Sequence, residues 1–115
     1  MHILDTVVFY TNNIPAVVEF YTNKMGLKLD YRQGDTYASF LFDNNVRLGI
    51  KKASEEREIP GTQAFFFTSK DAKADYEDAK ARGLEIYKEL TDEPWAVEFS
   101  VLDPDGNKIE YLQRK

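Results

Sequence analysis

The pattern of hydrophobic and polar positions predicts one helix and four strands in the first half of the chain. Residues 3–11, ILDTVVFYT, are β-branched and aromatic, which is typical of a strand. Apolar positions then recur at helical spacing from Ile14 to Met25, after an Asn-Asn pair suited to a cap and with Pro15 near the start. Further strands are expected at residues 27–31, 36–43 and 46–50. The predicted order is β-α-β-β-β.

The same order returns after a charged segment, KKASEEREIPG at residues 51–61, which we interpret as a solvated linker. A helix is expected to begin at Ser69 or Asp71 and to end at Gly83, where glycine favours termination. Strands are predicted around it at residues 63–68, 84–87, 95–102 and 108–113. The DPDG segment between the last two strands indicates a turn and is assigned no chemistry.

An internal repeat supports this division. MGLKL at residues 25–29 matches RGLEI at 82–86, and Thr6 is separated from Gln63 by the same number of residues. We therefore expect one domain, residues 1–115, made of modules 1–52 and 61–115 joined by the linker. The expected fold class is α+β, with tandem β-α-β-β-β modules forming a curved, half-closed sheet around a ligand cavity.

Composition narrows the possible functions. With 115 residues and 43% hydrophobic content, the chain can form a core, and its 14% aromatic share favours a lined pocket or a dimer interface. A net charge of −5 without a basic patch argues against nucleic acid and anionic membranes as partners. The absence of cysteine excludes disulfides and thiolate chemistry. With no recognisable secretion signal or long apolar run, the cytoplasm is the expected location.

Three segments resemble the vicinal oxygen chelate superfamily, which contains glyoxalase I, bleomycin-resistance proteins, extradiol dioxygenases and fosfomycin-resistance enzymes. They are LDTVVFYTNN at residues 4–13, EFYTNKMGLKL at 19–29 and EPWAVEFSVLDPDGNKIEYLQ at 93–113. The resemblance implies a binding cavity and a homodimer. It also implies that metal ligands, where present, lie on the opening and closing strands of each module.

The resemblance places the metal-ligand positions of this family at Thr6, Gly49, Gln63 and Glu110, with Leu48 as an alternative to Gly49. Only Glu110 is a strong ligand for a divalent ion. The chain is therefore most similar to bleomycin-resistance-like members without a metal, and no cofactor or catalytic residue is expected. The alternatives are a metal-dependent lyase, isomerase or dioxygenase that uses Glu110, and a structural or regulatory dimer without a ligand.

The candidate ligand contacts are polar and aromatic residues of the expected cavity. Each has a second interpretation: Glu110 as a solvated strand residue, Thr6 and Gln63 as partners of each other or of Glu110, and Trp95 as core or dimer packing. Most of the phenylalanines are expected in the core. For the strand at residues 36–43, the sequence does not determine which of its two faces points into the cavity. The expected ligand is a small cationic or polar aromatic molecule, contacted by Glu110, Gln63, Thr6, Trp95, Phe65 and Phe40.

Overall fold

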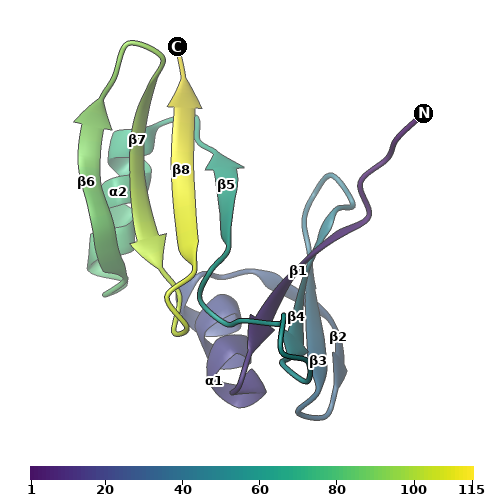
Figure 1. Cartoon of the computed structure of the whole chain (residues 1–115). Helices are drawn as coiled ribbons and strands as arrows, with labels where there is room; N and C mark the ends of the chain where they lie inside the picture. Colours follow the sequence, from purple (N-terminus) through teal and green to yellow (C-terminus); the bar gives the residue numbers. More distant parts are fainter. The chain divides into compact units, whose positions relative to one another are not determined.

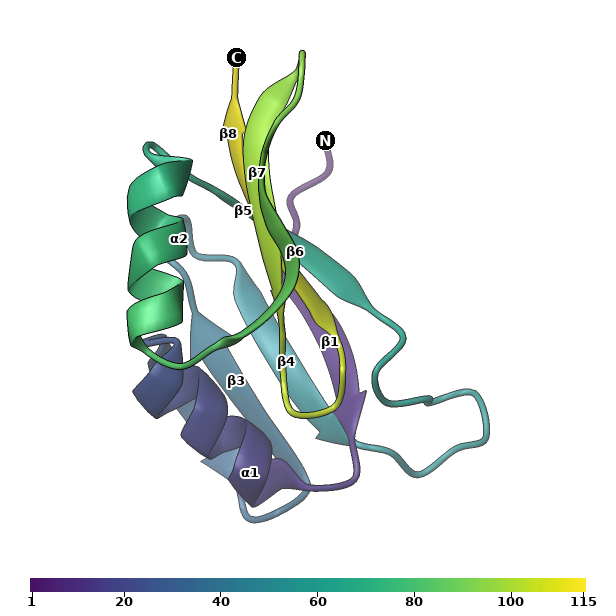
Figure 2. The ribbon, with the colours of Figure 1, turned by 90° about the vertical axis from the view of Figure 1, so that its left-hand side faces the viewer.

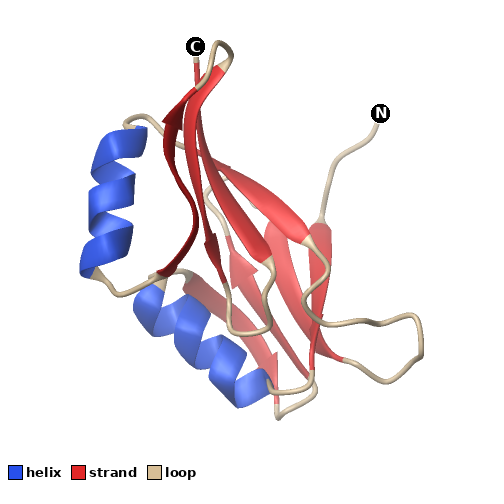
Figure 3. Cartoon of the chain, turned by 60° about the vertical axis from the view of Figure 1, so that its left-hand side comes forward, coloured by secondary structure: helices blue, strands red, loops and turns tan.

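Each half of the chain forms a four-stranded sheet with helical structure on one face (Figure 1). The computed structural model describes residues 1–115 and contains two units, Met1–Gly61 and Thr62–Lys115. In Figure 3, each sheet carries its helix on one side only. The predicted α+β class and the repeated β-α-β-β-β order are confirmed. No helix is long and apolar enough to cross a membrane.

The first unit contains a mixed sheet in the order β1-β4-β3-β2. Strand β1 runs parallel to β4, whereas β4, β3 and β2 are antiparallel neighbours. This arrangement places β1 and β2 at the two edges of the sheet. The elements are β1 (Thr6–Thr11), α1 (Ile14–Glu19), a π-helical segment η1 (Phe20–Lys24), β2 (Lys28–Gln33), β3 (Tyr37–Leu41) and β4 (Arg47–Lys52).

The first helix begins where the sequence predicts. The Asn13 side chain accepts a hydrogen bond from the Ala16 backbone N–H at 3.1 Å, and Pro15 occupies the first turn. The expected continuous helix differs in its second half, where π-helical bonding replaces α-helical bonding over Phe20–Lys24. Gly26, with φ of 71°, then takes the left-handed conformation that ends the helical region.

Alternation along the strands separates a helix-covered face from a helix-free face in the first sheet. Phe9, Phe40 and Ile50 are buried on the covered face, and the Phe40 ring lies 5.5 Å from that of Tyr21 in η1. The register pairs Phe9 with Ile50 and Val8 with Gly49 on opposite faces. The helix-free face therefore holds Thr6, Val8, Tyr10, Tyr37, Ser39, Leu41, Arg47, Gly49 and Lys51.

The second unit repeats this topology in the order β5-β8-β7-β6. Asp71 caps its helix through the Ala74 N–H at 3.1 Å, and Gly83 follows the helix with φ of 72°. Figure 2 shows α2 against one side of this sheet. The elements are β5 (Ala64–Thr68), α2 (Ala72–Ala81), β6 (Glu85–Asp92), β7 (Ala96–Leu102) and β8 (Lys108–Arg114).

Strand β6 is longer than the sequence predicts. It extends to Asp92, through residues expected to form a loop, because a hairpin with β7 continues to the Glu93–Ala96 backbone hydrogen bond of 2.8 Å. The extension brings Lys88 and Thr91 into register with Ser100 and Glu98 of β7.

Stacked aromatic rings form the core between α2 and its sheet. The rings of Phe99 and Tyr111 stack at 4.6 Å, Tyr76 of α2 packs edge-on against Phe99 at 5.3 Å, and Phe67 lies 5.3 Å from Tyr111. Burial raises the pKa of Tyr111 to about 12. Because Phe99 and Tyr111 face α2, their strand neighbours Ser100 and Glu110 belong to the helix-free face.

The pairing of the first strand in each unit shifts the alignment of the two units by one residue relative to the repeat that the sequence indicates. Arg47 N–H bonds to the Asp5 carbonyl, and Lys108 N–H bonds to the Gln63 carbonyl. The β-sheet pairs that follow are Thr6 with Arg47 and Ala64 with Lys108. The equivalent of Thr6 is therefore Ala64, and the alignment of Thr6 with Gln63 is wrong.

Candidate functional site

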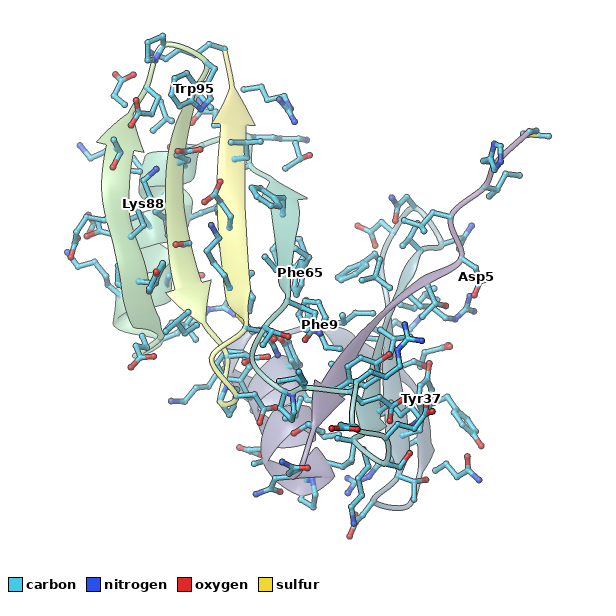
Figure 4. All side chains as sticks on the ribbon, in the orientation of Figure 1. Asp5, Phe9, Tyr37, Phe65, Lys88 and Trp95 are labelled. Atoms are coloured by element: carbon cyan, nitrogen blue, oxygen red, sulfur yellow. The ribbon has the colours of Figure 1, made fainter.

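A polar row crosses the helix-free face of the second sheet. Lys88 of β6 pairs with Ser100 of β7, Ser100 pairs with Glu110 of β8, and Glu110 pairs with Phe66 of β5. Cross-strand partners on one face lie within side-chain reach of each other. One residue from every strand of the sheet therefore contributes to a single continuous row. Figure 4 shows Lys88 and Trp95 on this sheet, with α2 behind it.

Two carboxyl groups of this face interact with each other. Glu98 and Glu110 are only 5% and 6% exposed, and each carboxyl group shifts the pKa of the other. Lys88 Nζ contacts Glu98 Oε1 at 2.5 Å, and this bond lowers the pKa of Glu98. Burial, followed by the nearby Glu98 charge, raises the pKa of Glu110. Glu98 is thus the ionised member of the pair, and Glu110 takes up a proton more readily.

Lys108 lies between Glu110 and an aromatic ring. Its Nζ is 3.8 Å from Glu110 Oε1 and 5.9 Å from the centroid of the Phe66 ring. The first distance is too long for a hydrogen bond, and the second is near the limit of a cation–π contact. Phe66 is 56% exposed. The ammonium group therefore occupies this position with loose contacts on both sides.

Ser100 has an unused hydroxyl in the middle of the row. The residue is fully buried, and its Oγ has no hydrogen-bond partner. An unpaired buried hydroxyl is unfavourable for stability, so such a group needs an explanation. The Trp95 indole, which is 60% exposed, helps to lower the pKa of Glu98 after the larger effect of Lys88. This face of the sheet thus combines a hydroxyl without a hydrogen bond, two buried carboxyl groups and exposed aromatic rings.

The helix-free face of the first sheet is built differently. Tyr37 crosses toward Gly49, so that a Cβ at residue 49 would lie 2.5 Å from the Tyr37 hydroxyl. The Tyr31 ring lies 6.4 Å from that of Tyr37, and Arg47 bonds to Asp30 at 2.9 Å, which raises the pKa of Arg47. This face presents tyrosines and an ion pair. Tyr37 is labelled on it in Figure 4.

The six residues that the sequence indicates as ligand contacts do not all lie on the helix-free faces of their sheets. Glu110 lies in the row, and Trp95 directly precedes β7 of the same sheet. Thr6 belongs to the helix-free face of the first sheet, where its hydroxyl donates a hydrogen bond to Asp5 at 2.6 Å. Phe40 is a correction: it is fully buried on the covered face of the first sheet.

Phe65 and Gln63 also depart from the expected arrangement. Phe65 pairs with Ile109 and packs edge-on against Phe67 at 4.9 Å, on the covered face of the second sheet. Its neighbour Phe66 is the ring that faces Glu110. Gln63 precedes β5 by one residue, so alternation places it away from the face of Ala64 and Phe66. Its Oε1 is buried without a hydrogen-bond partner.

Sequence reasoning missed Glu98, Ser100, Lys88, Lys108 and Phe66. A signal for the first two exists, since both are polar residues two positions apart in the apolar strand AVEFSVL. No comparable signal marks the two lysines, because lysine is common on exposed strand positions. Phe66 sits in a run of three phenylalanines whose orientation depends on register.

The residues at the family's metal positions do not form a suitable donor set. Thr6, Gly49 and either Gln63 or Ala64 stand where strong ligands would be needed, and Glu110 is the one carboxylate. The structure contains no group of three or more His, Cys, Asp or Glu side chains that could hold a metal ion. The Tyr37 hydroxyl also fills the space beside Gly49.

The fold and sites define a small α+β protein with two open sheets and a polar, aromatic helix-free face on each. Residues 3–111 match the Glyoxalase/Bleomycin resistance protein/Dioxygenase superfamily. The chain belongs to this family, as the resemblance in the sequence implies. No curated protein matches the chain by sequence.

Solved structures of other proteins share the fold. TnmS3, an antibiotic-binding protein from Streptomyces sp. CB03234, has a TM-score of 0.88 at 18% identity, with 100% of this chain and 98% of that chain covered. A glyoxalase/bleomycin resistance protein/dioxygenase from Nocardioides has 0.83 at 25% identity, with 99% and 84% covered. The bleomycin-binding protein of Streptomyces verticillus, in complex with copper(II)-bleomycin, has 0.79 at 20% identity, with 100% and 98% covered.

Proposed function

We propose that this protein binds a small cationic or polar aromatic molecule at the helix-free face of its second sheet, without a metal ion and without catalysing a reaction. The observation that carries this proposal is the cross-strand row in which the unpartnered Ser100 hydroxyl lies beside buried Glu110, next to exposed Phe66. Apolar surface with a few convergent polar groups is characteristic of small-molecule sites.

Proteins with this fold include ones that bind small molecules. Structures with this fold include an antibiotic-binding protein and a bleomycin-binding protein. In this chain, Glu110 has no imidazole and no metal-ligand set beside it, since its polar neighbours are Glu98, Ser100 and the two lysines. A ligand held by hydrogen bonds and aromatic contacts needs none of those groups. Sequestration of the molecule is the function that follows.

Ligand screening tests the binding role. Trp95 is the only tryptophan in the chain, and it directly precedes β7, the strand that carries Glu98 and Ser100, so its fluorescence can report on the site. Aromatic amines, phenols and aromatic amides should change this fluorescence in the wild-type protein and much less in a Glu110→Gln variant. Glu56→Gln, which removes an exposed carboxylate in the first unit, is the matched control. If no compound is bound, or if both variants behave alike, the proposal is wrong.

Metal content separates binding from the enzymatic alternative. Purified protein is incubated with excess zinc, nickel or iron(II), desalted and analysed for metal per chain. We expect a value near zero. Nearly stoichiometric metal that is lost in Glu110→Ala would overturn the metal-free proposal and would identify a metal-dependent enzyme.

We also infer that the protein is a homodimer and that it acts in the cytoplasm. Strands β1 and β5 each have one neighbour in their sheets, β4 and β8, so one edge of each strand has no strand partner within its sheet. Such edges are suited to pairing with a second copy. Sedimentation at micromolar concentration tests the dimer, and a purely monomeric result would contradict it. Cell fractionation tests the location.

A further inference from the structure

The ammonium group of Lys108 occupies a position with the features of a cation site. On one side is the Glu110 carboxyl group at 3.8 Å, and on the other is the Phe66 ring at 5.9 Å. A carboxylate together with an aromatic face is a favourable environment for an organic ammonium group. Both contacts are long, so the lysine gains little from either of them. Lys108 is also partly exposed, with 38% of its side chain accessible, so its ammonium group has a route into solvent.

We propose that the Lys108 ammonium group occupies the position of a ligand's ammonium group. The ligand is a monocationic organic amine that displaces Lys108 from Glu110 and Phe66. This inference rests on the proposed function and identifies the chemical class of its ligand. It assigns Lys108 the role of an autoinhibitory contact that a competing cation removes.

The unpartnered Ser100 hydroxyl is the second observation behind this proposal. Ser100 is fully buried, is the direct cross-strand partner of Glu110 and has no hydrogen bond of its own. Its oxygen can accept a hydrogen bond that Lys108 does not supply. A ligand ammonium group with two or three N–H donors can bond to Glu110 and Ser100 together while its substituent lies on Phe66. Such a ligand satisfies a polar atom that the protein leaves unsatisfied.

The charge of the row favours a single positive charge on the ligand. Glu98 is already paired with Lys88 at 2.5 Å, which leaves Glu110 and Lys108 as the exchangeable pair. When Lys108 moves into solvent, one negative charge remains on Glu110 and is matched by a monocation. An anionic ligand would meet two carboxyl groups, and a dication would leave one charge unbalanced in a buried site.

The decisive experiment compares a cationic probe with its neutral counterpart. Binding of benzylamine and of benzyl alcohol is measured by calorimetry and by Trp95 fluorescence in the wild type, in Lys108→Met and in Lys73→Met. The last variant removes an exposed lysine of α2 and makes the same change in net charge. We expect Lys108→Met to bind benzylamine roughly tenfold more tightly than the wild type. Benzyl alcohol binding and the Lys73→Met variant should be unaffected.

The gain should depend on the other members of the row. In the Lys108→Met background, adding Glu110→Gln or Ser100→Ala should remove most of the gain for benzylamine. Unchanged benzylamine affinity in Lys108→Met would overturn the inference. So would an equal gain for benzyl alcohol, because the effect would then come from the added apolar surface of methionine.

A measurement on the wild-type protein keeps the inference testable if Lys108→Met does not fold. Lys108 Nζ lies 5.9 Å from the centroid of the Phe66 ring, so the neighbouring ε-methylene protons should show a ring-current shift. Saturating benzylamine should abolish this shift, and benzyl alcohol should not. Persistence of the shift in the benzylamine complex would contradict displacement.

Failure of this inference can be distinguished from failure of the proposed function. If a neutral aromatic compound binds in a Glu110-dependent way while Lys108→Met leaves benzylamine affinity unchanged, this inference alone is wrong. If neither the wild type nor Lys108→Met binds any probe or any compound of the screen, both proposals are wrong.

Discussion

The Tyr37 hydroxyl lies 2.5 Å from the point that a Cβ of residue 49 would occupy, so Tyr37 and Gly49 are sterically dependent on each other. Gly49 of β4 occupies the position in the first unit that Glu110 of β8 occupies in the second, because their partners Val8 and Phe66 hold equivalent places in β1 and β5. One sheet therefore carries a carboxyl group at this position, and the other carries a glycine covered by a tyrosine.

The first prediction tests this dependence. Gly49→Ala should lower the free energy of unfolding by about 1–3 kcal/mol, because the new methyl group forces the Tyr37 ring to move. In a Tyr37→Phe background the loss should be smaller, since the closest atom is absent. Urea denaturation of the wild type, both single variants and the double variant measures the coupling. Strictly additive losses would show that the two residues are independent.

The second prediction separates two phenylalanines. Phe40 is fully buried, so Phe40→Ala should cost about 3–5 kcal/mol of stability by leaving a cavity. Phe66 is 56% exposed, so Phe66→Ala should change stability by only about 0.5 kcal/mol but should weaken ligand binding. Thermal denaturation and the fluorescence assay report the two effects. A stable Phe40→Ala variant with impaired binding would contradict this assignment and support Phe40 as a ligand contact.

The third prediction concerns the segment after β4. Glu58 Oε1 accepts hydrogen bonds from Lys51 Nζ at 2.7 Å and from the Ser54 N–H at 2.9 Å. The Lys51 bond, followed by the Ser54 N–H, lowers the pKa of Glu58 from 4.5 to about 2. A lowered folded-state pKa means that the ionised carboxylate stabilises the fold above the unfolded pKa, and that this contribution disappears as the pH falls toward about 2.

Glu58→Gln should therefore be less stable than the wild type at neutral pH, and the difference should vanish in strong acid. Urea midpoints measured for both proteins across that pH range provide the test. Glu56→Gln, at an exposed position of the same segment, should match the wild type throughout. A pH-independent deficit in Glu58→Gln would mean that its hydrogen bonds act without a contribution from charge.

Local signals account for the features that the sequence predicted correctly. The Asn13 and Asp71 caps and the two helix-ending glycines act within a few residues, so the helix ends and the first helix start could be predicted without knowing the fold, and the second start was narrowed to Ser69 or Asp71. Glu110 could be identified for a related reason, since it is a carboxylate in an otherwise apolar strand within a recognisable family motif.

Register explains what the sequence could not provide. A shift of one residue moves every side chain of a strand to the opposite face, and the repeat between the modules carried such a shift in β5. Phe65 was therefore expected where Phe66 lies. The contact between Glu98 and Glu110 joins neighbouring strands through pairings that no local pattern contains. The prediction that Phe40 contacts the ligand is wrong for the same reason, since the sequence does not determine which face of its strand points inward.

The fourth prediction uses the unpartnered hydroxyl of Ser100. Because this buried group has no hydrogen bond, Ser100→Ala should raise the free energy of unfolding by about 1 kcal/mol. The same variant should bind benzylamine less tightly. Urea denaturation and calorimetry on one preparation measure both effects. A loss of stability would indicate that the hydroxyl is satisfied in solution and is not reserved for a ligand.

The fifth prediction is that the contribution of Glu110 to stability changes with pH in the opposite direction to that of Glu58. Burial and the Glu98 charge raise the pKa of Glu110, so the folded state retains a proton that the unfolded chain releases. The stability contribution of Glu110 is thus most favourable below its unfolded pKa and is lost as the pH rises through the higher folded value.

Glu110→Gln removes this ionisation, so the variant should be at least as stable as the wild type at neutral pH, with its advantage shrinking in acid. The same variant should lose ligand binding. Urea denaturation across the acidic to neutral range, together with the fluorescence assay, tests both parts. A Glu110→Gln variant that is less stable at neutral pH would show that attraction to Lys108 and Lys88 outweighs the cost of burial. A more stable variant that binds nothing would mean that the protein keeps a buried carboxyl group for its ligand at the expense of its own stability.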